Sequence, residues 1–363
     1  MAATEVGVNH PLAQKLWSKR LFHEVIKEQW ASKFMGEDSN SVIQIQSDTK
    51  KAAGDRITIG LRVLLTGDGV QGDDTLEGNE EALTLYSDNI FINQLRHATR
   101  SKGKMSEQRV PWSVREENRM GLKDWWAERI EKWAANQLAG NTLVTDTKYT
   151  GNQATITVDA NHLLIAGPNG QGSTAETSIS STTVIGTGNY LTLTDIDRYV
   201  ARAKTLSPKI RPIMMGGKQW YVMFLHPYQV FALRNDAGAN NSWNVIQRAA
   251  VQGGDLTNNP LFTGALGVYN QTILHEWSYL PTAVSVSAVT IGATRRAVFC
   301  GAQAAGMAYG QDGGENQMTW VEELFDFENQ LGVSAGMIGG LKKTVFNSQD
   351  FGSIVVSSYA PPV

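Results

Sequence analysis

Helical periodicity is strongest over residues 113–139, where apolar side chains recur every three or four positions between charged ones. The apolar stripe consists of Leu122, Trp126, Ile130, Trp133 and Leu138. Ser113 followed by Glu116 has the capping-box spacing that satisfies free amides at a helix start, and Gly140-Asn141 is a typical helix end. We therefore predict one helix about 40 Å long, with its tryptophans in the core.

A second helical pattern covers residues 10–35. Its apolar positions are Leu12, Leu16, Trp17, Leu21, Val25, Ile26, Trp30 and Phe34. An amphipathic helix has to cover its apolar face with a partner surface. Two alternatives stay open: the helix docks on its own domain, or it lies as an arm across a neighbouring copy of the chain. In the second case Trp17 and Trp30 are candidate contacts between subunits.

Two β-strand patterns enclose a long polar loop. Residues 55–65 are β-branched and partly alternating, and residues 84–96 form a second candidate strand. The loop between them is rich in glycine and acidic residues and contains no Lys or Arg from residue 66 to residue 81. Loops of this length without secondary structure are usually functional or disordered. We expect an extended hairpin that projects from a core.

The rest of the chain mixes strand patterns with short helices. Helices are predicted at 194–205 and 228–234, and residues 142–190 are predicted to be an excursion of strands and loops rich in Thr, Gly, Asn and Ser. A glycine-rich turn is expected between the strands at 318–326 and 340–346. These strands are predicted at 220–225, 266–277, 284–291, 296–300, 318–326, 340–346 and 354–356. The order of elements predicts an α+β fold.

Charge divides the hairpin region into two neighbouring segments of opposite sign. The acidic residues of the loop are Asp68, Asp73, Asp74, Glu77, Glu80 and Glu81. The basic residues that follow the hairpin include Lys102, Lys104 and Arg109. Such segments are complementary, within one chain or between copies. The alternative is that both are solvated loops without a fixed partner.

Composition narrows the class of protein. The chain has 363 residues, a formal net charge of −3 and a pI of about 6.1, which argues against a dedicated nucleic-acid-binding protein. Its single cysteine, Cys300, lies in an apolar stretch and is expected to be a buried hydrophobic residue, so no disulfide framework supports the fold. We find no secretory signal and no apolar run long enough to span a bilayer.

The sequence offers no positive case for catalysis. Phosphate-loop, metalloprotease, paired-cysteine and nucleophile-elbow motifs are absent. His275-Glu276 lies on a predicted strand, where the two side chains point to opposite faces, and His226 is interpreted as structural. The acidic loop lacks the ligand spacing of a calcium loop. We therefore expect no catalytic residue, no metal site and no cofactor.

Several segments, taken together and in order, resemble the major capsid proteins of N-four-like podophages and their relatives. The resemblance covers nearly the whole chain and is weakest over residues 142–190. The segments are Leu64 to Asp73, Leu76 to Glu81, Arg100 to Met105, Arg109 to Glu117, His226-Pro227, Thr263 to Gly267, His275-Glu276, Gly301 to Ala304, Gln330 to Val333, and Gly339 to Lys343.

This resemblance implies an HK97-like capsid fold and a division of the chain into five regions. Residues 1–50 would form an N-terminal arm, and residues 51–107 the extended E-loop hairpin with its flanks. Residues 108–190 would hold the spine helix of the P-domain and the strands or insertion after it. The A-domain would occupy 191–315, and residues 316–363 would return to the P-domain.

The resemblance also implies a function. The chain would be a structural protein that assembles in the bacterial cytoplasm, in hexamers and pentamers, into the icosahedral head of a tailed phage. It would enclose double-stranded DNA without sequence-specific binding, would contact a portal and scaffolding or decoration proteins, and would have no membrane partner. Two alternatives remain: an encapsulin-like compartment shell with the same fold, and a soluble ligand-binding protein or enzyme.

Overall fold

The computed structural model describes most of the chain. The described residues are 30–46, 54–63, 65, 67–73, 75–111, 113–167, 185, 189–235, 267–284, 290–291, 293–310 and 318–362. Most of the predicted helix at 10–35, including Trp17, lies outside them, and so does Asp74. The described end of that segment is not α-helical: Trp30–Phe34 forms a 3-10 turn, η1, and strand β1 (Met35–Gly36) follows it.

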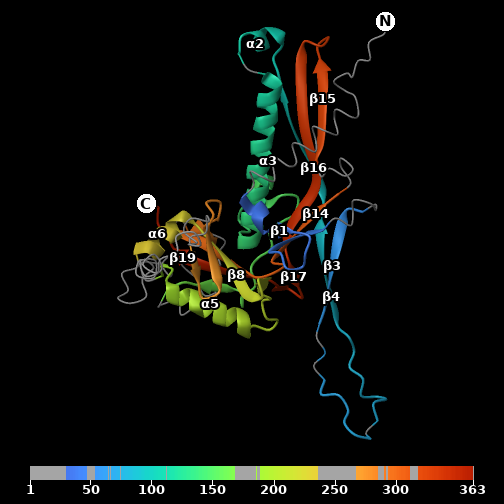
Figure 1. Ribbon diagram of the computed structural model, residues 1–363, viewed down its shortest axis with the longest axis vertical. Coiled ribbons are helices and arrows are strands. Elements are labelled where there is room, and N and C mark those ends of the chain that lie inside the picture. Colours follow the sequence, from blue (N-terminus) through green and yellow to red (C-terminus); the bar gives the residue numbers. More distant parts are fainter. Residues whose placement is uncertain are drawn as a thin grey trace.

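The molecule consists of an elongated arm, a compact lobe and a projecting hairpin (Figure 1). The arm is built on the long helix α3 (Val114–Ala139), which is 26 residues long and confirms the predicted helix. It ends where Gly140 takes a left-handed φ of 64° and donates its N–H to the Asn136 carbonyl. The predicted capping box is wrong, because Ser113 makes no side-chain cap and Glu116 pairs with Arg119 instead.

A six-stranded sheet runs beside α3. Its order is β1-β2-β14-β16-β15, and β5 also pairs with β16. The remaining bounds are β2 (Ile43–Gln46), β5 (Asn93–Arg100), β14 (Ala305–Tyr309), β15 (Thr319–Phe325) and β16 (Gln330–Lys343). Because β16 is much longer than its neighbours, it runs from the far end of the arm down to the root of the hairpin (Figure 1).

A turn is present where the glycine-rich turn was predicted, but it is limited to residues 326–329 and contains no glycine. The glycines expected in that turn lie inside β16. Their small size is required by neighbouring strands. A Cβ at Gly340 would lie 1.9 Å from the Phe91 carbonyl oxygen, and one at Gly336 would lie 2.9 Å from Cγ of Arg96. Glycine therefore marks close approach of backbones here, where the sequence pattern was interpreted as a turn.

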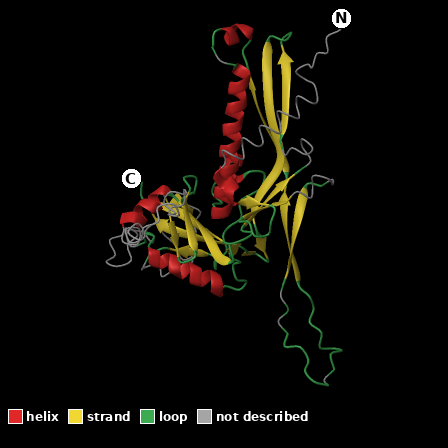
Figure 2. Ribbon diagram, in the orientation of Figure 1, coloured by secondary structure: helices red, strands yellow, loops and turns green. Residues whose placement is uncertain are grey.

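A seven-stranded sheet forms the centre of the compact lobe, in the order β6-β19-β13-β8-β10-β9 with β7 on β8. Helices α5 (Leu193–Thr205) and α6 (Pro227–Asn235) belong to the same lobe (Figure 2). The strands are β6 (Leu163–Ile165), β7 (Ile213–Met215), β8 (Lys218–Leu225), β9 (Gly267–Tyr269), β10 (Thr272–Glu276), β13 (Thr294–Cys300) and β19 (Ser353–Tyr359). The two helices and the strands predicted at 220–225, 296–300 and 354–356 are confirmed. The strand predicted at 266–277 is wrong, because β9 and β10 form an antiparallel pair there. The strand predicted at 284–291 is also wrong, because its two described ends belong to two short strands that pair antiparallel.

The predicted projecting hairpin is present. Strands β3 (Arg56–Arg62) and β4 (Leu85–Phe91) pair antiparallel, and the loop between them extends far from the rest of the molecule (Figure 1). The segment predicted as one strand at 84–96 is two, because the chain leaves β4 after Phe91 and joins the arm as β5. The short remaining elements are α2 (Lys104–Gln108), α4 (Thr147–Thr150), β11 (Ala283–Val284), β12 (Thr290–Ile291), β17 (Val345–Phe346) and β18 (Gln349–Asp350).

Two large apolar clusters hold these parts together. One lies between α3 and the arm sheet and includes Trp126 and Trp133, so the predicted core role of these tryptophans is confirmed. The other fills the compact lobe around Tyr199, Tyr221 and Phe299. Cys300 is fully buried at the end of β13, as expected. The fold is α+β, as predicted.

Candidate subunit contacts

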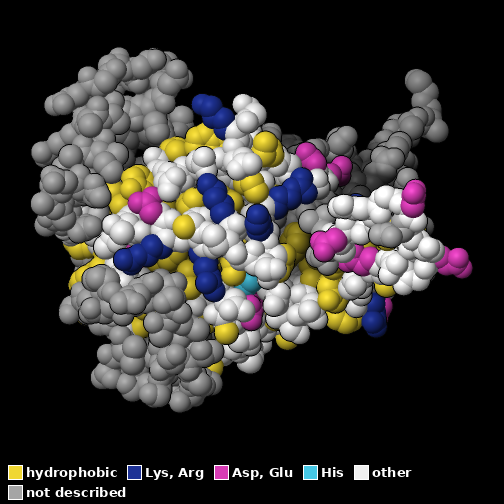
Figure 3. Space-filling model, turned by 90° about the horizontal axis from the view of Figure 1, so that it is seen from below, with side chains coloured by type: hydrophobic (Ala, Val, Ile, Leu, Met, Phe, Trp, Pro, Cys, Tyr) yellow, Lys and Arg dark blue, Asp and Glu magenta, His cyan; other side chains and the backbone are white. Residues whose placement is uncertain are grey.

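The acidic residues of the hairpin loop lie at its exposed end. Asp68, Asp73, Glu77, Glu80 and Glu81 are all exposed. Two of these carboxylates accept main-chain hydrogen bonds: Glu81 from the Gly67 amide at 2.7 Å and Glu80 from the Gly78 amide at 2.8 Å. Viewed along the hairpin, acidic side chains gather on the projecting loop, while Lys and Arg are spread over the neighbouring face (Figure 3). The loop is therefore an acidic tip, with its charges turned to solvent.

The basic candidates lie at the opposite end of the molecule. Lys102, Lys104 and Arg109 are exposed on and around α2, at the far end of the arm (Figure 1). Their backbone is fixed to the β15–β16 turn, because the Lys104 amide donates to Asn329 at 3.2 Å and Gln330 donates to the Lys102 carbonyl at 3.1 Å. The two charged ends are separated by the whole length of the molecule. The structure therefore does not bring the predicted acidic and basic residues together within one chain.

The root of the hairpin is fixed by a buried ion pair. Lys342, near the end of β16, contacts Asp88 of β4, and both side chains are buried. The same ammonium donates to the Asn89 carbonyl at 3.0 Å. The second oxygen of Asp88 accepts the Val345 amide at 3.1 Å. Asp88 thus ties the hairpin to β16 of the arm sheet with one oxygen and to Val345, just after β16, with the other.

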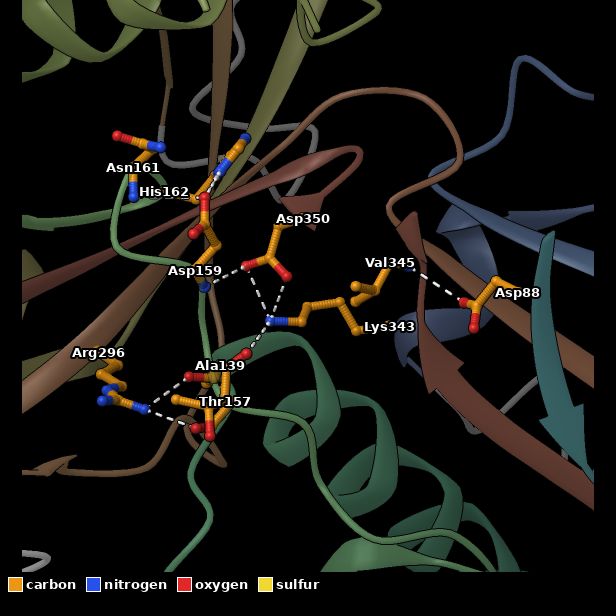
Figure 4. Close-up of polar contacts among 11 residues, drawn as sticks. Asp88, Ala139, Thr157, Asp159, Asn161, His162, Arg296, Lys343, Val345 and Asp350 are labelled. Atoms are coloured by element: carbon orange, nitrogen blue, oxygen red, sulfur yellow. Dashed lines mark hydrogen bonds and ion pairs between the residues drawn. The ribbon is translucent and has the colours of Figure 1, made fainter. Parts of the chain in front are cut away.

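The next residue makes a second buried pair on the other side of the strand, because successive strand residues point to opposite faces. Lys343 Nζ lies 2.7 and 2.8 Å from the two carboxylate oxygens of Asp350, and the two side chains are 0% and 1% exposed. The Asp159 amide donates to the same carboxylate at 3.3 Å, and the Thr157 carbonyl lies 3.5 Å from Nζ (Figure 4). Burial lowers the pKa of Lys343, and the nearby Asp350 carboxylate opposes this shift.

A third buried cation closes the C-terminal end of α3. Arg296 of β13 donates to the carbonyls of Ala139 and Gly140, at 2.9 Å each (Figure 4). A helix end carries free carbonyls and a partial negative charge, which a guanidinium satisfies. Arg296 therefore joins the long helix of the arm to the central sheet of the compact lobe.

Sequence reasoning missed these three buried cations as structural residues. Two adjacent lysines within the otherwise apolar pattern of residues 340–346 were a usable signal, since a strand places one of them on each face. The partners could not be found in this way. Asp88 lies 254 positions from Lys342, and Arg296 lies 156 positions from Gly140.

The histidines show no sign of a metal or catalytic site in the part of the chain that the structure describes. No group of three or more His, Cys, Asp or Glu residues there is arranged to hold a metal ion. His226 is buried, and its Nδ1 accepts the Tyr228 amide at 3.2 Å. Burial, together with the positive charge of Arg295, lowers the pKa of His226 to about 4. His226 is therefore neutral at physiological pH and fixes the start of α6.

Among the described residues, no helix has the length and hydropathy required to cross a bilayer. Trp30 is the first residue of η1.

Comparison with known proteins gives a consistent result. The family model described as phage capsid protein matches residues 5–362. The major capsid protein of Pseudomonas phage KPP25 is 30% identical over 367 residues, which covers 94% of this chain and 93% of that protein. The capsid of Ralstonia phage GP4 is 31% identical, covers 99% of both chains and superposes with a TM-score of 0.75. The capsid of cyanophage Pam1, at 20% identity and a TM-score of 0.74, shows the same fold over 93% of this chain.

These matches cover the long helix, the arm sheet, the compact lobe and the hairpin, and the solved structures among them give the architecture as HK97-like. They agree with the resemblance seen in the sequence. The chain belongs to the phage capsid protein family, and it is a structural protein of a phage head.

Proposed function

We propose that this chain is the major shell subunit of an icosahedral phage head, assembled from hexamers and pentamers in the bacterial cytoplasm around double-stranded DNA. Its role would be structural and not catalytic, and its main partner would be further copies of itself. A portal and scaffolding or decoration proteins would be further partners. The observation that supports this proposal best is the placement of the acidic tip and the basic end at opposite ends of one elongated molecule.

Such a placement favours contacts between copies. Two complementary surfaces on different parts of one subunit form a heterologous contact, which produces closed rings when the rotation between copies closes. Charges that cannot meet within one chain can meet in this way. The acidic tip would then contact Lys102, Lys104 and Arg109 of a neighbouring copy. Trp17 and Trp30 remain candidate contacts of the N-terminal arm.

The apolar surface of the hairpin supports the same proposal. The loop and its flanking strand expose Leu65, Leu76, Leu83 and Leu85 to solvent, far from either core. Exposed apolar surface contributes about 25 cal/mol per Å² when it is buried against a partner. A projecting hairpin with several exposed leucines is therefore suited to lie on a second copy, where the leucines add buried area and the acidic residues add specificity.

Electron microscopy of the purified chain tests the proposed function. Closed particles of uniform size are the expected result. A chain that stays a stable monomer across a series of pH, salt and protein concentrations would overturn it. Co-expression with a candidate portal or scaffolding protein from the same genome, followed by purification of particles, tests the additional partners.

Charge reversal tests the proposed contact. Asp73→Lys with Asp74→Lys should reduce particle yield, and adding Lys102→Glu with Lys104→Glu should restore it. Asp124→Lys is a matched control, since Asp124 is exposed on the side of α3 and away from both charged ends. Assembly should also weaken at high salt, because exposed charge pairs are screened. Normal particles from the first double variant would exclude this contact and leave the proposed function standing.

A further inference from the structure

The far end of the arm carries a fully exposed aromatic side chain. Phe327 lies in the tight turn between β15 and β16 and is 103% exposed. The turn closes with the Asn329 amide donating to the Asp326 carbonyl at 3.0 Å. Phe327 lies outside both apolar clusters, so its ring contributes nothing to the packing of its own chain. Because aromatic side chains are enriched at protein interfaces, a ring held in this way at the extremity of a protein is a candidate interface residue.

The backbone of the turn is held in an unfavourable conformation. Asp326, Phe327 and Glu328 have consecutive φ angles of 53°, 49° and 67°, all in the left-handed region. A bulky residue such as Phe adopts this region at a cost. Strained conformations of this kind concentrate where they have a function. Here the conformation belongs to the turn that carries the fully exposed Phe327 ring.

A pocket lies at the same end of the arm. It has a volume of about 200 Å³ and is open to solvent. Lys104 of α2, Arg115 of α3, Glu322 and Leu324 of β15, and Leu331 of β16 contribute to its lining. Its rigid floor is the Arg115–Glu322 ion pair, in which Nε and one terminal nitrogen of Arg115 donate to the same carboxylate oxygen at 2.9 and 2.8 Å. The pocket is therefore formed by side chains from four different elements.

One polar atom beside this pocket has no hydrogen-bond partner among the described residues. Glu322 is 2% exposed, and its Oε1 already accepts from Arg115 and, at 2.7 Å, from the indole of Trp320. Its buried Oε2 has no hydrogen-bond partner in the described part of the chain. A buried acceptor without a partner is destabilising, so a donor that reached this oxygen from a second copy would stabilise the site. An incoming turn brings both an apolar side chain and main-chain N–H donors.

Size and chemistry fit a phenylalanine. Apolar cavities of about 150 Å³ accept a benzene ring, so a pocket of about 200 Å³ has room for a phenyl group. Leu324 and Leu331 offer apolar contact to the ring, and the Arg115 guanidinium offers a cation–π contact. Phe327 does not fill the pocket of its own chain, because its ring is fully exposed and does not line the pocket.

We propose that Phe327 of one subunit inserts into the pocket beside Glu322 and Leu324 of a second copy. This inference rests on the proposed function, since it needs copies of the chain to meet at the far end of the arm. The contact is heterologous, because the aromatic residue of one copy meets the pocket of another. Since both lie at the same end of the arm, a ring of such contacts would close around an axis close to that end. Where six- and five-membered rings tile a shell, three rings meet at each vertex. A three-membered cycle of Phe327 contacts would join them there.

Removal of the ring is the first test. Phe327→Ala should raise the subunit concentration required for particle formation by about tenfold or more, from the loss of one buried phenyl group per contact. The thermal midpoint of the unassembled chain should stay unchanged, since the ring packs against nothing there. Val321→Ala is the matched control, because Val321 is exposed on β15, near Phe327 in the sequence, but does not line the pocket. Particles from Phe327→Ala at the wild-type concentration would overturn the proposal.

Disulfide trapping is the second test, and it reports the geometry of the contact. Chains with Phe327→Cys are mixed with chains carrying Leu324→Cys, assembled and oxidised, while buried Cys300 stays unreactive. Disulfide-linked dimers that form only in the mixture support the proposal. Dimers from Phe327→Cys alone would overturn it, because the Phe327 side chains would then meet one another. The proposed function itself fails only if the wild-type chain forms no particles. A negative result with the Phe327 variants overturns the Phe327 contact alone.

Discussion

The buried pair of Lys343 and Asp350 offers a sharp test of how this fold is stabilised. Both side chains are excluded from solvent, and among the described residues the carboxylate also accepts the Asp159 amide. Replacing Lys343 with Met keeps the length of the side chain and removes its charge. It leaves Asp350 as a buried carboxylate without a counter-ion. We expect Lys343→Met to lower the free energy of unfolding by about 3–5 kcal/mol.

A double variant separates the charge from the volume. Lys343→Met with Asp350→Leu removes both charges together and should restore the free energy of unfolding to near the wild-type value, because apolar pairs often replace buried ion pairs without loss. Lys123→Met is the matched control: its pair with Asp124 is partly exposed, with the two side chains at 17% and 70%, and should contribute less than about 1 kcal/mol. The contrast between the variants isolates the effect of burial.

Equilibrium denaturation of the unassembled chain measures these differences. The chain is kept dilute, guanidinium chloride is the denaturant, and fluorescence of the core tryptophans reports unfolding. A loss of 3–5 kcal/mol would be a large fraction of the roughly 5–15 kcal/mol that stabilises a typical domain. A loss below about 1 kcal/mol for Lys343→Met, or a double variant as unstable as the single one, would refute the reasoning.

Three further predictions concern other buried groups. Arg296→Met should lower the free energy of unfolding by about 2–3 kcal/mol, since two carbonyls at the end of α3 lose a charged donor; amide exchange in the last turn of the helix should rise. Gly340→Ala should prevent β16 from pairing beside the Phe91 backbone, and loss of soluble chain on expression measures this. Acidification should destabilise the chain by up to about 3 kcal/mol, because between pH 6.5 and about 4 the unfolded chain protonates His226 and the folded chain does not. A His226→Asn variant, whose amide oxygen can replace Nδ1, should unfold with a flatter pH dependence, measured by denaturation at each pH.

The sequence was informative wherever structure depends on neighbours along the chain. The helix of residues 113–139, its end at Gly140 and the buried tryptophans follow from a repeat of three to four positions, which tertiary contacts do not alter. Prediction failed where a local pattern is compatible with two structures. Glycines indicate a turn when nothing else is known, but in β16 they are required by strands from distant parts of the chain.

The same distinction applies to the candidate contacts. Composition and spacing determined that an acidic loop and a basic segment exist and that the chain lacks recognisable catalytic motifs. They also determined that two strands and the long loop between them form a projecting hairpin. Only the tertiary structure decided that the two charged segments, close together in the sequence, lie at opposite ends of the molecule. It also decided which carboxylate meets each buried lysine, and that Phe327 stands beside a pocket. The physical reason is that local conformation depends on neighbouring residues, whereas the position of a charge in space depends on how segments far apart in the chain pack against one another.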